Sequence, residues 1–574
     1  MRPRSRAASV SALTGALVLT AIAQTACGGG SDPSTTDIPQ LPPATPARFS
    51  GDCAALSSAL AGLPNTTLTE TSTVSAGTLS VGGAPVAEHC LVRGRMFERT
   101  SPIDGASYAI GFEMRLPKDW NGRFYYQANG GLDGNVVTAT GSHGGGPRTH
   151  ALHQGFAVLS SDAGHSAAQN PSFGRDPQAR LDYGYQAVGK LTPVAKEIIR
   201  RVYGKGPDRS YIGGCSNGGR HAMVAASRYA TEYDGYLIGA PGFNLPLAAV
   251  ANIWGAQRYA TVATDASDLS TAFTAQERQL VSQAILDRCD ALDGATDGLV
   301  QDTAACQATF DLMRDVPTCA GARDGSCLSA DQKSVIASIF AGATTSAGTR
   351  FYASFPYDPG LRGAGVAFWE FTAPLALDSG AVGIVFKAPP ENLAGFNGAS
   401  FSLNTPVDTL YEYIHSTSLS YTESAMSFMT PPRPSDWSTL RNRGAKVLVY
   451  HGVSDHIFSL HDTLRWYDAL NANHGGQATR FARVFPVPGM GHCSGGPATD
   501  QFDLLTPLVQ WVEQGTVPER IVASARGAGN PGGVNNELPS DWAADRTRPL
   551  CPYPQVARYR GSGDLDRADS FVCQ

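Results

Sequence analysis

The feature that most limits the possible folds is a five-residue segment, Gly214-Cys215-Ser216-Asn217-Gly218, which matches the pattern G-x-S-x-G. It follows the apolar segment Tyr211-Ile212-Gly213 and precedes a helix-compatible segment that begins at Arg220. A serine among small residues between a strand and a helix is typical of a strained turn that lifts the hydroxyl group out of a sheet. In a chain with 63 glycines the pattern alone could also arise by chance.

Short apolar segments alternate with helical patterns on both sides of a long irregular region. The predicted strands are Arg123 to Gln127, Phe156 to Ser160, Tyr211 to Gly213, Tyr236 to Ile238, Lys446 to Tyr450 and Arg483 to Val487. Between the second and third strands, apolar residues from Leu191 to Val202 repeat at helical spacing, and Pro193 is expected to start or kink that helix. This alternation predicts a parallel sheet with crossover helices, interrupted from about Phe243 to Leu440 by an insertion.

Two polar residues follow the last two predicted strands. Asp455 comes after Val447 to Tyr450, and His492 comes after Val484 to Val487. The order Ser216, Asp455, His492 is the chain order of the α/β-hydrolases, in which each residue follows a strand of the sheet. A serine needs a base such as His492 to take its proton, and the base needs a carboxylate to orient it. Taken alone, Asp455 could be a turn residue and His492 a histidine without a catalytic role. Together with Ser216, in this order and after these strands, they predict a catalytic triad.

Eleven cysteines point to an oxidising compartment, since ten remain for pairing when Cys27 is set aside. The count alone does not give the connectivity. Proximity in sequence suggests Cys53 with Cys90, Cys289 with Cys306, Cys319 with Cys327, and Cys551 with Cys573. The remaining Cys215 and Cys493 adjoin the predicted Ser and His, so they could lie within the ~6 Å Cα separation of a disulfide. Two unrelated buried thiols are the alternative.

The amino terminus has the pattern of a signal peptide, residues 1–27, with three early arginines before the apolar segment Val10 to Ile22. Cleavage could follow Ala23, or precede Cys27, which would then carry a lipid; Gln24 is atypical for a lipoprotein signal. Residues 28–46 are predicted to be a flexible linker. We therefore expect a secreted, periplasmic or outer-membrane-anchored protein, whose contact with a membrane would be limited to the lipid anchor.

The charge balance excludes one class of partner. There are 44 Lys and Arg against 50 Asp and Glu, a net charge of -6, so no basic excess exists to bind nucleic acid.

The segments Gly214-Cys215-Ser216-Asn217-Gly218-Gly219-Arg220 and Gly491-His492-Cys493-Ser494-Gly495-Gly496 resemble the tannase and feruloyl esterase family, and the similarity extends from about Cys53 to Cys573. The resemblance implies an α/β fold with an α/β-hydrolase core at 47–242 and 440–574 and a large lid at 243–439. It also implies the five cysteine pairs, and an oxyanion hole formed by the backbone N–H groups of Gly131 and Asn217.

An acidic loop, Asp290 to Leu299, is a candidate metal site. Its three carboxylates on tight turns suit Ca²⁺, although an acidic surface turn would have the same composition. The resemblance implies a structural Ca²⁺ held by the side chains of Asp290, Asp293 and Asp297 and by the carbonyl groups of Ala295 and Leu299.

Two aromatic residues, Trp369 and Phe458, are candidate walls of a substrate pocket, and either could equally be core. Family members that act on a terephthalate monoester bind its carboxylate with a lid arginine followed by Phe-Ser. Residues 371–380 contain neither, and Lys387 is the only Lys or Arg from Gly363 to Pro432.

We therefore expect a monomeric serine carboxylesterase that hydrolyses small aromatic esters of the feruloyl or galloyl type through an acyl-enzyme on Ser216. A terephthalate monoester is the alternative substrate. The alternative of another class is a surface lipoprotein that binds aromatic ligands without catalysis.

Overall fold

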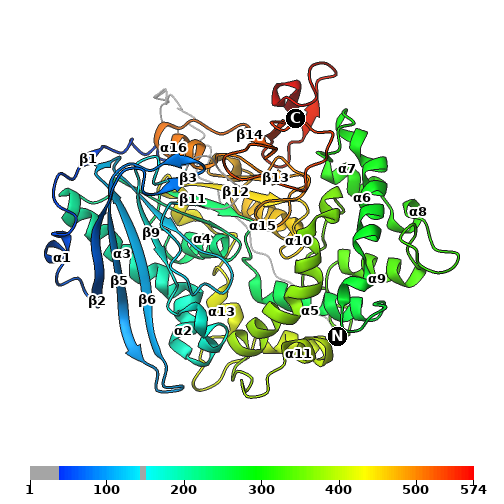
Figure 1. Ribbon diagram of the computed structural model, residues 1–574, viewed down its shortest axis with the longest axis horizontal. Coiled ribbons are helices and arrows are strands. Elements are labelled where there is room, and N and C mark those ends of the chain that lie inside the picture. Colours follow the sequence, from blue (N-terminus) through cyan, green and yellow to red (C-terminus); the bar gives the residue numbers. More distant parts are fainter. Residues whose placement is uncertain (1–37, 143–149) are drawn as a thin grey trace, which may run out of the picture. The chain divides into compact units, whose positions relative to one another are not determined.

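The computed structural model describes residues 38–142 and 150–574, and residues 38–574 belong to one unit. The predicted signal peptide, Cys27 and most of the predicted linker lie outside the described residues. Within the described residues, nine strands form a single mixed sheet in the order β13-β12-β11-β10-β8-β9-β6-β5-β2 (Figure 1). Their bounds are β2 Thr66–Val74, β5 His89–Thr100, β6 Ser107–Pro117, β8 Arg123–Gln127, β9 Ala157–Ser161, β10 Arg209–Cys215, β11 Gly235–Gly239, β12 Lys446–Gly452 and β13 Ala482–Val487.

The six strands from β13 to β9 are parallel, as the sequence predicts, and each lies within two residues of its expected bounds. Cys215 at the end of β10 pairs with Gly239, and Gly452 at the end of β12 pairs with Val487. The loops after β10, β12 and β13 therefore leave the sheet at the same edge.

The other end of the sheet is antiparallel, and its strands were not predicted from the sequence. Strands β2, β5 and β6 pair antiparallel, and β6 pairs antiparallel with β9. The physical reason is the short connection, residues 101–106, between β5 and β6, because a parallel crossover needs a dozen residues or more.

The strand residues alternate between two faces. Phe124, Tyr126 and Ile212 belong to the hydrophobic core that includes helix residues Ile198 and Met223. The intervening residues, such as Tyr125 and Leu237, pack in a second core on the opposite face with Trp511. The covering helices are α3 Ala187–Tyr203, α4 Asn217–Arg228, α15 Leu460–Asn473 and α16 Leu505–Gln514. Pro193 lies inside α3 and does not start it.

Residues between β11 and β12 form a mostly helical region with its own hydrophobic core (Figure 1). Its helices are α5 Leu245–Ala260, α6 Ala275–Cys289, α7 Thr303–Thr309, α8 Leu312–Asp315, α9 Ala330–Phe340, α10 Ala364–Ala367, α11 Gly398–Asn404, α12 Val407–Tyr413, α13 Ala425–Met429 and α14 Ser438–Asn442. Residues 368–386 continue α10 as three wide π-helical segments. This insertion corresponds to the predicted lid, whose boundaries at 243 and 439 stay a prediction.

The remaining short elements are α1 Leu56–Ala59, α2 Pro177–Leu181, β1 Ala47–Arg48, β7 Asp119–Trp120, β3 Ser80–Val81, β4 Ala84–Pro85, β14 Ile521–Ser524, β15 Thr547–Leu550, β16 Ala557–Tyr559 and β17 Phe571–Cys573.

All five predicted disulfides are confirmed: Cys53–Cys90, Cys215–Cys493, Cys289–Cys306, Cys319–Cys327 and Cys551–Cys573. Such bonds are typical of proteins that fold in an oxidising compartment. No helix among the described residues is both long enough and apolar enough to span a bilayer.

Candidate active site

Ser216 lies in a sharp turn between β10 and α4. Its φ of 66° and ψ of -127° lie in a region that side-chain-bearing residues rarely adopt, and its N–H donates to the Gly239 carbonyl at 3.0 Å. A Cβ atom on Gly214 or Gly218 would come within 2.4 Å of the Ala128 carbonyl oxygen. The two glycines are therefore required by close backbone contact, and the strained turn is the one expected from the sequence.

Asp455 and His492 are in direct contact at the same sheet edge. Asp455 Oδ2 lies 2.8 Å from His492 Nδ1. A carboxylate can accept but not donate, so Nδ1 carries the hydrogen and Nε2 is free to act as a base. In the part of the chain that the structure describes, this Nε2 atom is buried and has no hydrogen-bond partner.

The Asp455 carboxylate is held in place by three further contacts. Its Oδ1 atom accepts hydrogen bonds from the N–H groups of Ile457 and Phe458, each at 3.0 Å, and its Oδ2 atom lies 3.3 Å from Nε2 of His451. The His451 ring is itself fixed by the Thr463 hydroxyl group. Burial alone would raise the pKa of Asp455, but the His492 and His451 rings outweigh burial and hold that pKa below its ordinary value. The sequence prediction did not identify His451.

A disulfide joins the Ser216 turn to the His492 loop. Cys215 precedes Ser216, Cys493 follows His492, and their Cα atoms are 6.0 Å apart. The Ser216 turn and the Asp455–His492 pair therefore lie at the same sheet edge, although the three residues are far apart in sequence.

The loop after β8 carries the predicted oxyanion residue Gly131, whose φ of 65° is tolerated by glycine. A Cβ built on its neighbour Gly130 would lie 3.8 Å from Ser216 Cβ, so this loop adjoins the Ser216 turn.

A buried side chain that the sequence prediction missed ties this loop to helix α4. Asp133 Oδ2 accepts a hydrogen bond from Asn217 Nδ2 at 2.7 Å and lies 2.8 Å from His221 Nε2. Burial raises the pKa of Asp133 and lowers the pKa of His221. Asp133 thus connects the two segments that carry the predicted oxyanion donors.

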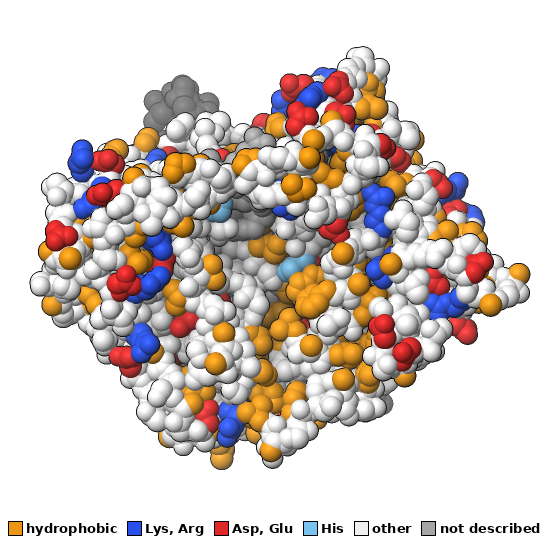
Figure 2. Space-filling model, viewed as in Figure 1, with side chains coloured by type: hydrophobic (Ala, Val, Ile, Leu, Met, Phe, Trp, Pro, Cys, Tyr) orange, Lys and Arg blue, Asp and Glu red, His pale blue; other side chains and the backbone are white. Residues whose placement is uncertain are grey.

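The two predicted aromatic residues flank the imidazole. The Trp369 and Phe458 rings both meet the His492 ring edge to face, at centroid distances of 5.0 and 5.4 Å. Trp369 is half-buried, whereas Phe458 is 2% exposed and also packs on Gly242. Figure 2 shows that the surface is hollowed at the centre of one face, with histidine in the wall and hydrophobic side chains beside it.

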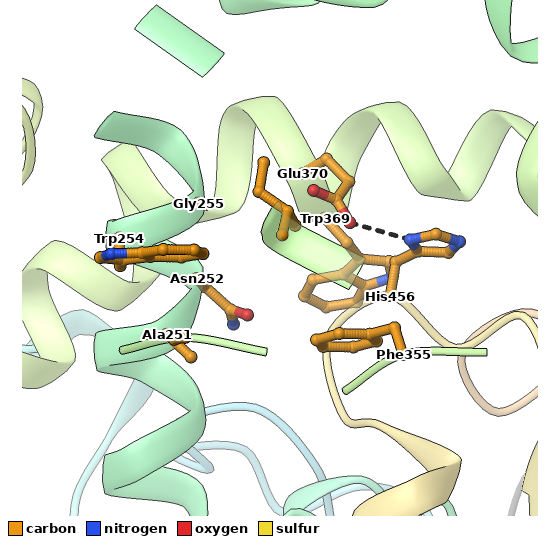
Figure 3. A pocket seen from close by; sticks show the side chains of 10 residues that line it. Ala251, Asn252, Trp254, Gly255, Phe355, Trp369, Glu370 and His456 are labelled. Atoms are coloured by element: carbon orange, nitrogen blue, oxygen red, sulfur yellow. Dashed lines mark hydrogen bonds and ion pairs between the residues drawn. The ribbon is translucent and has the colours of Figure 1, made fainter. Parts of the chain in front are cut away.

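Trp369 also lines a small cavity between helix α5 and residues 368–372 (Figure 3). Asn252 and Trp254 of α5 lie across it from the rings of Trp369 and Phe355. The polar members of the opposite wall are Glu370 and His456, whose side chains are hydrogen-bonded at 2.8 Å.

The predicted calcium loop brings its three carboxylates near one another. Asp290 and Asp293 are buried and accept hydrogen bonds from backbone N–H groups of the same loop, while Asp297 is paired with Arg548. Burial, followed by repulsion from Asp297 and Asp290, raises the pKa of Asp293 to about 7. The donor atoms are oxygen, which suits Ca²⁺, but no cluster of three or more His, Cys, Asp or Glu among the described residues is already arranged to hold a metal ion.

The sheet topology and the Ser216 turn define an α/β-hydrolase. Residues 90–574 match the family model described as tannase and feruloyl esterase, and the chain belongs to this family. It is therefore a carboxylic ester hydrolase, and a small ester is its substrate.

Several relatives match most of the chain. It is 40% identical over 531 residues, covering 86% of each chain, to mono(2-hydroxyethyl) terephthalate hydrolase of Piscinibacter sakaiensis. It is 28% identical over 491 residues, covering 81% of this chain and 83% of the relative, to a probable feruloyl esterase B of Emericella nidulans. The crystal structure of feruloyl esterase B from Aspergillus oryzae matches with a TM-score of 0.72 and 25% identity, covering 91% of this chain and 99% of that one.

Proposed function

We propose that this enzyme is an exported serine carboxylesterase that hydrolyses esters of hydroxylated aromatic acids, of the feruloyl or galloyl type, through an acyl-enzyme on Ser216. The observation that carries the proposal is the contact of Asp455 with His492, at 2.8 Å, on a loop that a disulfide ties to the Ser216 turn. Ligand binding alone would not require a nucleophile, a base and an orienting carboxylate in this arrangement.

Each residue then has a defined part in the reaction. His492 Nε2 takes the proton of Ser216 Oγ as that oxygen attacks the ester carbonyl carbon, and Asp455 stabilises the imidazolium that forms. The proton passes to the leaving alcohol, and His492 next activates the water that releases the acid. The N–H groups of Gly131 and Asn217 stabilise the negative oxygen, with each donor worth about 3 kcal/mol.

We propose the type of acyl group from the positive side chains that residues 363–432 of the lid can offer to a substrate. The relatives' names include both a terephthalate monoester hydrolase and a probable feruloyl esterase. A terephthalate monoester carries a carboxylate, which a cation would have to bind. Lys387 is ion-paired with Glu391 at 2.5 Å and stacks on Tyr413, so it is already occupied. This favours an uncharged acyl group and leaves the terephthalate monoester as the second candidate.

The test is an ester panel of methyl ferulate, methyl gallate and mono(2-hydroxyethyl) terephthalate, assayed with wild type and with Ser216→Ala. Turnover that survives in the alanine variant would disprove the mechanism, and a preference for the terephthalate ester would reverse the substrate ranking. A fluorophosphonate probe should label wild type at Ser216; a protein that only binds aromatic ligands would stay unlabelled.

We further propose a structural Ca²⁺ at Asp290, Asp293, Ala295, Asp297 and Leu299, supported by the three buried carboxyl groups that this loop brings together. The enzyme is proposed to be a monomer and to be exported, which its five disulfides favour; attachment of a lipid at Cys27 would anchor it to the outer membrane.

A further inference from the structure

The cavity beside Trp369 has a polar end that adjoins the proposed catalytic groups. Glu370 follows Trp369, whose ring meets His492, and His456 directly follows Asp455. The Glu370 and His456 side chains are 11% and 4% exposed, and Glu370 Oε1 lies 2.8 Å from His456 Nδ1 (Figure 3). Both side chains line the cavity, together with Trp369.

The hydrogen-bonding positions that remain free on Glu370 and His456 are acceptors. A carboxylate only accepts, so Nδ1 of His456 carries the hydrogen and, in the neutral ring, Nε2 is an acceptor. The Tyr259 hydroxyl is also close to Glu370, since burial and then Glu370 raise the pKa of Tyr259. A carboxylate has about four lone-pair sites, so acceptor capacity remains at Glu370. A group that donates a hydrogen bond is complementary to this end of the cavity, and a second carboxylate is not.

Arg278 interacts electrostatically with Glu370 but does not line the cavity. None of the described residues that line the cavity is Lys or Arg. The Arg278 side chain is buried, with its guanidinium carbon 5.7 Å from the centre of the Phe371 ring, and donates to the Phe273 carbonyl. A substrate carboxylate would therefore meet Glu370 without a cation between them, in a site of low dielectric where like charges repel strongly.

The size of the cavity sets which part of a substrate could enter. Its free space is about 20 Å³, which is room for about one water molecule. An aromatic ring does not fit in that space, but a hydroxyl group that replaces a water molecule does. The ring itself would lie along Trp369, on the side of His492.

We propose that Glu370 and His456 form a subsite for a hydroxyl group on the acyl ring, and that Glu370 selects hydroxyaryl over carboxyaryl acyl groups. This inference rests on the proposed function at Ser216 and adds the side chains that determine its specificity.

The experiment uses three matched methyl esters that differ at the ring position opposite the acyl chain, namely hydroxy, methoxy and carboxy, each as a benzoate and as a cinnamate. We expect wild type to have a kcat/KM at least tenfold higher for the hydroxy than for the carboxy ester. Glu370→Gln should reduce that ratio at least tenfold, chiefly through a lower KM for the carboxy ester. The control Glu412→Gln removes an exposed lid carboxylate that does not line this cavity and should leave the ratio unchanged.

A second measurement requires no variant. Free 4-hydroxybenzoate should inhibit wild type at least tenfold more strongly than terephthalate. An active Glu370→Gln enzyme with the wild-type ratio, or equal inhibition by the two acids, would overturn the subsite while leaving the esterase function intact. Absence of turnover of every ester by wild type would instead overturn the proposed function, and this inference with it.

Discussion

Asp133 Oδ2 lies 2.7 Å from Asn217 Nδ2, so one buried carboxyl group joins the loop of Gly131 to the residue that follows Ser216. Asp133 also closes its own loop, because its N–H donates to the Gly130 carbonyl at 3.2 Å. The spacing between the two proposed oxyanion donors therefore depends on this side chain. Such donors act through accurate placement, and the loss of one costs about 10²–10³ in kcat.

We expect Asp133→Ala to lower kcat for methyl ferulate by about 10- to 100-fold with KM within about threefold of wild type, because substrate contacts are unchanged. Asp133→Asn should recover most of the loss, since its amide oxygen can take the place of Oδ2 and accept hydrogen bonds from both Asn217 and His221. Steady-state kinetics with a thermal melt of each variant checks this prediction. A rise in KM with kcat unchanged would show that Asp133 has no part in oxyanion stabilisation.

The predictability of the site differs between its parts for physical reasons. Ser216, Asp455 and His492 each follow a strand that is visible in the sequence, and parallel strands bring their carboxyl ends together. The contacts of Asp133 with His221 and of Glu370 with His456 could not be predicted in this way. They join segments 88 and 86 residues apart whose meeting depends on how loops and lid helices pack.

The parts of the fold also differ in how far they could be predicted from the sequence. The parallel strands were predicted because they are short apolar segments, and nearly all residues of β8, β9, β11 and β12 are buried. In β5 the exposed Arg93 and Arg95 alternate with buried residues, the pattern of a strand with one solvated face. That alternation and the short connection to β6 were the available signals for the antiparallel half.

Removal of Ca²⁺ should destabilise the lid. The carboxylates of Asp290 and Asp293 are buried close together, and a bound cation would offset their repulsion. We expect EDTA to lower the Tm by several degrees, added Ca²⁺ to restore it, and Asp293→Asn to abolish the response. Asp287→Asn, an exposed carboxylate three residues before the loop, is the control and should respond as wild type does. A wild-type melt that is the same with and without EDTA, with no metal in the purified protein, would contradict the site.

Alanine substitutions of the two aromatic residues beside His492 should have different effects on stability and on KM. Phe458 is 2% exposed and packs on Gly242, so Phe458→Ala should cost about 3–5 kcal/mol of stability along with activity. Trp369 is half-buried and borders the cavity, so Trp369→Ala should raise KM for aromatic esters about tenfold with a smaller loss of stability. Kinetics and urea unfolding of both variants separate the two cases; equal losses of stability would refute the distinction.

The buried Asp378 side chain should make the stability of the enzyme depend on pH. Its side chain is buried in the lid, its hydrogen-bond partner is Asn252 Nδ2 at 3.3 Å, and burial raises its pKa to about 8. In the unfolded chain an Asp titrates near 3.9, so the folded state takes up a proton that the unfolded state lacks. Because the pKa of Asp378 is higher in the folded state, its contribution to the free energy of unfolding is fully present below about pH 4. This contribution is lost as the pH rises toward 8. Asp378→Asn keeps a polar partner for Asn252 and cannot ionise, so it should stabilise the enzyme by on the order of 2–4 kcal/mol at pH 8 and by progressively less toward pH 4. Urea unfolding of both proteins from pH 4 to 9 measures the difference. A stability difference that stays constant across this range would mean that Asp378 does not change its protonation state on folding.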